Sequence, residues 1–132
     1  MPSQTTAVAR VLIVHDNASV ADTFARTLRL QGYEVWAAPS ADEGLTLAQV
    51  HRPNAIILDL RMPLAANLSF VRTIRTVPGL AAIPVAIVTG DYHLDEPQEH
   101  EVHALGAQVH YTPLWVDELV TLARELVIPT RE

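Results

Sequence analysis

The chain of 132 residues contains no cysteine and no lysine. Without cysteine the fold cannot depend on disulfide bonds, and nothing indicates an oxidising compartment, so we expect a cytoplasmic protein. All nine basic residues are arginine, and fifteen acidic residues give a net charge of −6. Because an acidic surface repels phosphate groups, we expect no binding of nucleic acid by this chain alone.

Long apolar runs are also absent. Residues 1–9 have neither a basic cluster nor an extended apolar core, so we expect no signal peptide and no contact with a membrane. The length suits one domain, which we place at residues 10–127, with flexible tails at 1–9 and 128–132. The last residues are compatible with a true terminus or with the start of a linker. A glycine-rich phosphate loop is missing too, which argues against a nucleotide-binding enzyme of the doubly wound class.

The sequence does contain short apolar runs, and each of them ends in polar side chains. A run without apolar/polar alternation is typical of a strand buried on both faces, although periodicity alone leaves a buried helix open. Three runs fit this description: 11–14 before His15 and Asp16, 55–58 before Asp59, and 83–88 before Thr89. Open α/β sheets bind ligands at the carboxyl ends of their strands, which makes Asp59 a candidate site residue. The alternative is a strand-end carboxylate that bonds to loop amides.

Segments with helical spacing of apolar residues separate these runs. We predict further strands at 33–37 and 109–113, and helices at 19–31, 40–51, 68–76, 98–105 and 117–127. Pro97 limits the fourth helix to residues after it, and we expect poor order around it. Alternating strands and helices predict an α/β fold with a parallel sheet covered on both faces. Its carboxyl edge would then gather His15, Asp16, Asp59, Thr89 and Thr112.

Asp16, Asp59 and Thr89 together suit phosphoryl chemistry on a carboxylate. One aspartate would attack as the nucleophile, and the second would help to hold Mg²⁺ against the phosphoryl oxygens. The hydroxyl would form a hydrogen bond with the phosphorylated product.

Four motifs in this order resemble the receiver domain of bacterial two-component response regulators: Val-Leu-Ile-Val-His-Asp-Asn, Ile-Ile-Leu-Asp-Leu-Arg-Met-Pro, Val-Thr-Gly, and Leu-Gly-Ala followed by Tyr-Thr-Pro. The resemblance extends from Arg10 to Val127. It implies a flavodoxin-like (βα)₅ fold with strand order 2-1-3-4-5. It also implies that a histidine kinase phosphorylates Asp59, that Mg²⁺ is bound by Asp16, Asp59 and the backbone carbonyl of Arg61, and that Thr89 is a switch residue.

The sequence departs from the family pattern at two positions of the expected site. His15 stands where receivers have the first acid of a pair, and imidazole is a poor ligand for Mg²⁺, so His15 should weaken or reshape the metal site or contact a metal-bound water. Thr112 stands at, or beside, the position of the family's lysine, because the segment before Pro113 is one residue shorter. The family's switch aromatic corresponds to Tyr111 in a shifted register, or is absent with Val109 in its place.

We therefore expect a single-domain response regulator, a signalling protein and not an enzyme. Its partners would be a sensor histidine kinase or phosphotransfer protein and an unknown downstream protein that binds around the fourth helix, last strand and last helix. The competing hypothesis is a pseudo-receiver, an interaction or homodimerisation module that works without phosphorylation. Asp16, Asp59 and Thr89 favour the first, whereas His15 and the missing lysine favour the second.

The remaining polar cluster and the tryptophans have simpler interpretations. Six residues between 93 and 103 could bind a metal, but their spacing fits a solvated acidic face better: His93, Asp95, Glu96, Glu99, His100 and His103. We expect Trp36 and Trp115 to pack against the core, with a partner anchor as the alternative for Trp115. Tyr92 is a loop residue that could gate the site.

Overall fold

The computed structural model describes residues 8–59, 64–90, 94–112 and 114–127. These residues form five strands and five helices that alternate along the chain. The strands are β1 (Arg10–His15), β2 (Glu34–Ala38), β3 (Ala55–Asp59), β4 (Val85–Thr89) and β5 (Ala107–Tyr111). The helices are α1 (Ala18–Leu30), α2 (Ala41–His51), α3 (Leu64–Thr76), α4 (Glu96–Ala104) and α5 (Val116–Val127).

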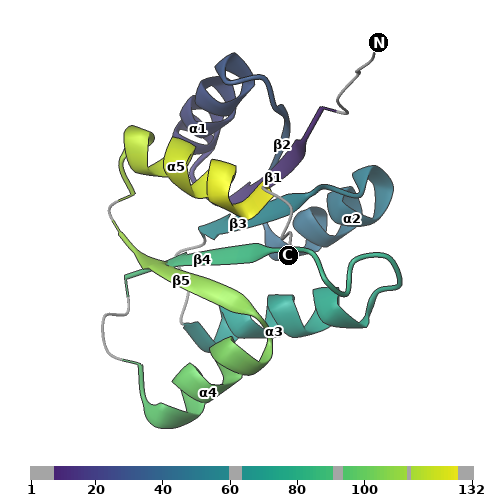
Figure 1. The fold of residues 1–132 in the computed structure, drawn as a ribbon, viewed down its shortest axis with the longest axis vertical. Coiled ribbons are helices and arrows are strands. Elements are labelled where there is room, and N and C mark those ends of the chain that lie inside the picture. Colours follow the sequence, from purple (N-terminus) through teal and green to yellow (C-terminus); the bar gives the residue numbers. More distant parts are fainter. Residues whose placement is uncertain (1–7, 60–63, 91–93, 113, 128–132) are drawn as a thin grey trace.

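The strands make one parallel sheet in the order β2-β1-β3-β4-β5, which confirms the predicted topology. In Figure 1, α1 and α5 lie together on one side of the sheet, and α3 and α4 lie on the other. Because every strand points the same way, the carboxyl ends of β1, β3 and β4 meet at one edge. The polar residues that follow the apolar runs are therefore brought to that edge.

Alternate residues of each central strand enter two separate cores. Val11 and Ile13 pack with residues of α1 and α5, such as Phe24 and Leu122. Leu12 and Val14 pack with residues of α3, such as Leu68. Side chains of both sets are almost completely buried. Apolar contact on both faces of the sheet explains why the strand sequences show no polar alternation.

The beginning of α4 differs from the prediction. The helix begins at Glu96, two residues before the predicted start at Gln98. Asp95 accepts a hydrogen bond from the backbone N–H of Gln98, and the Gln98 side chain accepts one from the N–H of Asp95, so the two residues form a capping box. Pro97 lies in the first turn, where a residue without an N–H costs no helical hydrogen bond. The proline therefore belongs to the helix instead of excluding it.

Other boundaries move by a few residues for local reasons. The third helix begins at Leu64 and not at Leu68, because Leu64 is itself fully buried against the core. The fourth strand begins at Val85, since the N–H of Ile83 is held in a turn by the carbonyl of Leu80. The fifth strand begins at Ala107, directly after Gly106, whose φ of 69° allows a sharp change of direction.

Among the described residues, no helix combines the length and apolar character that crossing a bilayer requires. Of the tails predicted at 1–9 and 128–132, residues 1–7 and 128–132 lie outside the described residues.

Candidate phosphoacceptor site

His15 and Asp59 are side by side at the carboxyl edge of the sheet. They are register partners on the neighbouring strands β1 and β3, so their side chains leave the sheet in the same direction. Both residues are buried, with 5% of His15 and 8% of Asp59 exposed. The Nε2 atom of His15 lies 3.3 Å from Oδ2 of Asp59. The sequence expectation that these residues gather at one edge agrees with this geometry.

The imidazole of His15 has a defined orientation. Its Nδ1 atom accepts a hydrogen bond of 3.0 Å from the backbone N–H of Asn17. Its ring meets the ring of Phe24 edge to face, with centroids 5.9 Å apart and an interplanar angle of 79°. Because Nδ1 accepts a hydrogen bond from the backbone N–H of Asn17, a neutral ring in this orientation would carry its proton on Nε2. That atom lies beside the carboxylate of Asp59.

Asp16 is the more open carboxylate of the site. Its Oδ1 atom lies 3.6 Å from Nδ1 of His15, which is too long for a hydrogen bond, and 41% of its side chain is exposed. The imidazole of His15 is therefore in contact with both aspartates. Asp16 is therefore more accessible to a ligand from solvent than Asp59, whose side chain is 12% exposed.

Thr89 and Thr112 lie at the ends of the next two strands. Thr89 is the last residue of β4 and is 3% exposed. Ile87, two residues before Thr89, pairs with Leu58 of β3. The backbone N–H of Thr112 donates to the carbonyl of Thr89, 3.0 Å away. A Cβ atom on Gly90 would lie 3.6 Å from Oγ1 of Thr112, so this hydroxyl is next to the residue that follows Thr89. Thr112 thus borders the same edge of the sheet as Thr89.

The donor set is compatible with a Mg²⁺ ion bound by two carboxylates. Mg²⁺ commonly takes one or two carboxylates and completes its shell with water and phosphate oxygens, which Asp16 and Asp59 allow. His15 offers no hard oxygen ligand beside Asp59, and its Nδ1 atom already accepts the hydrogen bond from Asn17. In the described part of the chain, no group of three or more His, Asp or Glu side chains is arranged to hold a metal ion. Arg61, whose carbonyl the family resemblance suggests as a ligand, lies outside that part.

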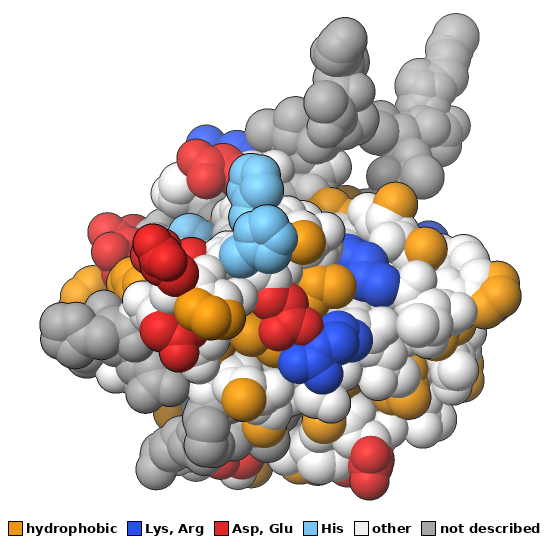
Figure 2. Space-filling model, turned by 90° about the horizontal axis from the view of Figure 1, so that it is seen from below, with side chains coloured by type: hydrophobic (Ala, Val, Ile, Leu, Met, Phe, Trp, Pro, Cys, Tyr) orange, Lys and Arg blue, Asp and Glu red, His pale blue; other side chains and the backbone are white. Residues whose placement is uncertain are grey.

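The histidine-rich segment forms one exposed face of α4. Glu96, Glu99, His100 and His103 are exposed and line a shallow groove with Pro97. Figure 2 shows this side of the molecule, where histidine and acidic side chains gather next to arginine side chains. Tyr92 and His93 lie outside the described residues, so the predicted gate and the sixth member of the cluster are not placed.

Two arginines on α3 connect it to α4, a relationship that the sequence analysis missed. Arg72 forms an ion pair with Glu101, and this hydrogen bond lowers the pKa of the Glu101 carboxyl group. Arg75 donates to the carbonyls of Ile83 and Leu105, and burial lowers the pKa of its guanidinium group. The only sequence signal is their spacing on the polar face of α3, which gives no indication of their partners.

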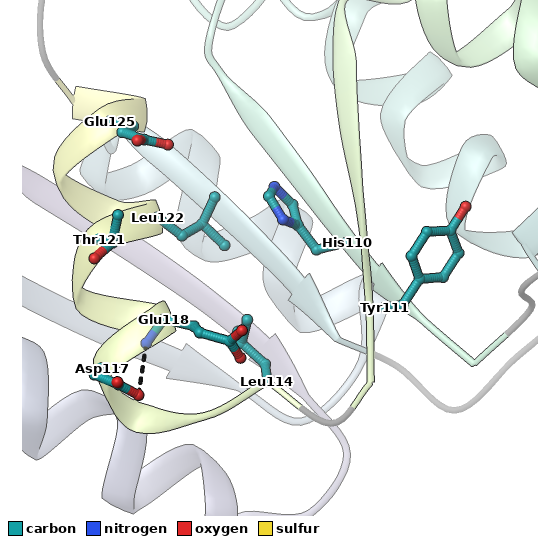
Figure 3. Close-up of a pocket in the computed structure, with 8 residues that line it drawn as sticks. All are labelled: His110, Tyr111, Leu114, Asp117, Glu118, Thr121, Leu122 and Glu125. Atoms are coloured by element: carbon teal, nitrogen blue, oxygen red, sulfur yellow. Dashed lines mark hydrogen bonds between the residues drawn. The ribbon is translucent and has the colours of Figure 1, made fainter.

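A groove of about 380 Å³ separates β5 from α5 (Figure 3). His110 points from β5 toward α5, whereas Tyr111 points away from the helix. Burial lowers the pKa of His110, and the nearby Glu125 and Glu118 oppose this effect. Tyr111 is 42% exposed and Trp115 is 62% exposed. The prediction that Trp115 packs against the core is therefore wrong, whereas Trp36 is partly buried and stacks on His51 with centroids 4.2 Å apart.

Comparison with known proteins identifies the family. Residues 11–112 match the family described as the response regulator receiver domain. The chain belongs to this family. As a receiver domain it is a signalling module of two-component systems. Members interact with histidine kinases or phosphotransfer proteins and typically bind Mg²⁺ at the acidic pocket.

Individual relatives of this receiver domain are transcriptional and chemotaxis regulators. It is 36% identical over 87 residues to the transcriptional regulatory protein PrrA of Mycobacterium bovis, a match that covers 66% of this chain and 36% of PrrA. It is 27% identical over 119 residues to the cell cycle transcriptional regulator CtrA of Caulobacter vibrioides, covering 89% of this chain and 50% of CtrA. The receiver domain thus spans about a third to a half of these relatives.

Solved structures confirm the fold of the receiver domain. The chemotaxis protein CheY4 of Vibrio cholerae superimposes with a TM-score of 0.77 at 29% identity, covering 91% of this chain and 99% of CheY4. The response regulator receiver protein of Pseudomonas putida gives a TM-score of 0.73, also at 29% identity, covering 92% of this chain and 99% of that protein. The CheY-like architecture agrees with the predicted flavodoxin-like fold and strand order.

Proposed function

We propose that this receiver domain accepts a phosphoryl group on Asp59 in a two-component phosphorelay. The observation that carries the proposal is the position of Asp59, which ends the central strand β3 beside the site's other polar residues. A carboxylate oxygen of Asp59 would attack the phosphorus of a phosphohistidine on a sensor histidine kinase or phosphotransfer protein. The new O–P bond forms as the P–N bond breaks, and the released imidazole takes up a proton from solvent.

Asp16 and Thr89 have supporting roles in this proposal. Asp16 and Asp59, together with the Arg61 carbonyl that the family resemblance suggests, would hold Mg²⁺. When bound, Mg²⁺ supplies positive charge beside the phosphoryl oxygens. The hydroxyl of Thr89 would form a hydrogen bond with a phosphoryl oxygen after transfer. The proposed location is the cytoplasm, where the phosphodonor protein would be met.

The output surface in this proposal consists of α4, β5 and α5. This surface contains three of the large apolar residues that are exposed in the described part of the chain. They lie close together in the sequence: Tyr111, Trp115 and Val116. Aromatic side chains that are exposed yet close to a groove are typical anchors for a protein partner. The partner would be a downstream protein or a second copy of this chain, with Tyr111, Thr89 and Thr112 linking the surface to the site.

A second candidate function is a pseudo-receiver that binds partners without being phosphorylated. Two observations favour it: the chain has no lysine, and the imidazole of His15 lies 3.3 Å from the phosphoacceptor. In this case the same surface of α4, β5 and α5 would bind its partner in a single conformation. Modification of Asp59 would then have no effect on binding.

Chemical phosphorylation distinguishes the two candidates. The protein is incubated with phosphoramidate and Mg²⁺, and intact mass spectrometry measures the addition of one phosphoryl group. We expect labelling of the native protein and of Asp42→Asn, which changes an exposed aspartate on α2, but not of Asp59→Asn. An unlabelled native protein, or equal labelling of Asp59→Asn, would contradict the proposed function and favour the pseudo-receiver.

A further inference from the structure

The groove between β5 and α5 carries negative charge along its helical wall. Asp117, Glu118 and Glu125 line it from α5, and among the described residues that line it there is no arginine. His110 points toward these acids from β5 (Figure 3). Glu118 and Glu125 both raise the pKa of His110 against the effect of burial, so their charges act across the groove. A groove with charge of one sign attracts the opposite charge.

Apolar side chains adjoin this acidic wall. Leu114 and Leu122 line the groove together with the acids. Trp115 follows Leu114 in the sequence and is 62% exposed. Its backbone N–H donates to Oε1 of Glu118 over 2.9 Å, which holds the backbone of Trp115 next to the acids. An arginine side chain suits such surroundings, because guanidinium pairs with carboxylates and also stacks on aromatic rings.

The groove is open along the outer edge of β5. In the described sheet β5 is the last strand and pairs with β4 alone. His110 and Tyr111 point to opposite sides of β5, yet both line the groove, so the groove reaches around the strand's edge. Extended segments bind such edges through main-chain hydrogen bonds, and their alternate side chains enter the neighbouring pockets.

We propose that this groove is the docking site for a cationic segment of a protein partner. The segment lies extended along the edge of β5 and places arginine or lysine side chains between the acids of α5, with Trp115 at one end. The occupant follows from charge complementarity and from the unpaired strand edge in the described sheet. The inference deepens the proposed function, on whose output surface it rests, by naming the chemistry of the partner.

Peptide titration of the ¹⁵N-labelled protein tests the proposal. The probe is a blocked heptapeptide of alternating threonine and arginine, and the same peptide with glutamate in place of arginine is its control. At physiological ionic strength charges more than about 8 Å apart are largely screened, which limits attraction to the net charge alone. We expect the arginine peptide to shift amide signals of β5 and α5 and the indole N–H signal of Trp115, assigned by its loss in Trp115→Phe. The signal of Trp36 and the glutamate titration should show no shifts.

Variants at Thr121, an exposed residue that lines the groove, separate charge from shape. Thr121→Arg should weaken binding of the arginine peptide about tenfold or more, because like charges repel at close range. Thr121→Glu introduces a long side chain of opposite charge and should bind the peptide at least as tightly as the native protein. Thr46→Arg, at an exposed position of α2, makes the same change in net charge away from the groove and should stay within about threefold of native. Thermal melts verify folding of each variant.

Three outcomes would overturn the proposal. Equal weakening by Thr121→Arg and Thr46→Arg would show attraction to the net charge only. Equal weakening by Thr121→Arg and Thr121→Glu would show that the acids have no part in binding. A native dimer in sedimentation experiments that Thr121→Arg dissociates would place a second copy of the chain in the groove.

The titration also separates this inference from the proposed function, because it uses the unphosphorylated protein and Asp59→Asn. Peptide binding in the groove of a protein that phosphoramidate does not label would overturn phosphorylation of Asp59 and support the docking site. A labelled protein that binds no arginine peptide would overturn the docking site and leave phosphorylation intact.

Discussion

The guanidinium of Arg75 joins α3 to the end of α4, since its Nε donates to the backbone carbonyl of Leu105 over 2.8 Å. Its Nη1 donates to the carbonyl of Ile83, 2.7 Å away, just before β4. One side chain therefore satisfies two backbone acceptors from segments that lie far apart in the sequence. Arg72 adds an ion pair to Glu101 one turn earlier on the same helix.

Arg75→Ala should destabilise the protein and loosen α4. Removing the guanidinium leaves two partly buried carbonyls without their donor, which costs about 1–3 kcal/mol of unfolding free energy. Urea unfolding measures the loss, and hydrogen exchange should show faster exchange of α4 amides than of α1 amides. Arg26→Ala, which removes an exposed i,i+4 ion pair with Asp22, is the matched control and should change stability little. Equal effects of the two substitutions would contradict the assigned role of Arg75.

Mg²⁺ should bind the native protein more weakly than it binds His15→Asp. The aspartate adds a hard oxygen donor beside Asp59, whereas the imidazole of His15 offers only nitrogen, which Mg²⁺ binds poorly. Isothermal titration of both proteins with MgCl₂ would measure the difference, which we expect to be about tenfold or more. Gln49→Glu, at an exposed position of α2, adds the same negative charge away from the site and is the control. The expectation fails if the two affinities agree.

Thr112→Lys should strengthen the response to phosphorylation. A threonine hydroxyl offers one neutral hydrogen bond, whereas an ammonium group would form a charge-assisted bond with the phosphoryl oxygens. Beryllofluoride, a phosphate mimic, should therefore produce larger chemical-shift changes in α4 and α5 of the variant than of the native protein. Large shifts across both helices of the native protein would instead indicate that another group already couples the site to this surface.

Acidification below pH 6.5 should destabilise the protein in part through His110. Burial lowers the pKa of His110 from its usual 6.5, so between the two pKa values the unfolded chain binds more protons than the folded one. Its contribution to stability is complete above pH 6.5 and is lost as the pH falls through the folded-state pKa. Urea unfolding at several pH values should give a shallower slope for His110→Gln than for the native protein. His100→Gln, on the exposed face of α4, is the control and should keep the native slope.

Asn67→Ala should leave the stability unchanged or raise it by about 1 kcal/mol. The side chain of Asn67 is fully buried in α3, and neither of its polar atoms has a hydrogen-bond partner in the described part of the chain. Removing unpaired polar atoms offsets the small cavity, and alanine favours the helix. Leu68→Ala, at the next position, should cost about 2–5 kcal/mol in the same thermal or urea unfolding experiment. A comparable loss for Asn67→Ala would show that its amide has a partner.

The sequence predicted the features that depend on repeated patterns. The unbroken apolar runs identified the central strands because side chains on both faces of the sheet are buried, as Val11 and Leu12 are. The order of strands followed from the family motifs, and the polar edge followed from where the runs end. The start of α4 was missed because Pro97 was treated as a helix breaker, although the first turn tolerates it.

Contacts that depend on three-dimensional geometry could not be predicted. The orientation of the His15 ring depends on one backbone N–H two residues away, and the partners of Arg75 include a carbonyl thirty positions along the chain. The exposure of Trp115 is a third case, since an aromatic residue before an amphipathic helix has no periodicity that assigns it to either face. In each case the sequence shows the type of the residue, but it does not show which neighbour in the fold decides the residue's role.

Asn17 makes position 15 epistatic with the beginning of α1. Its side chain caps the helix and its backbone N–H binds the ring of His15, so one residue serves both helix formation and the orientation of the imidazole. A carboxylate at position 15 would have to accept the hydrogen bond from that N–H with a different distance and angle. Substitutions at positions 15 and 17 should therefore be non-additive, and engineering a metal site at one of them requires re-optimising the other.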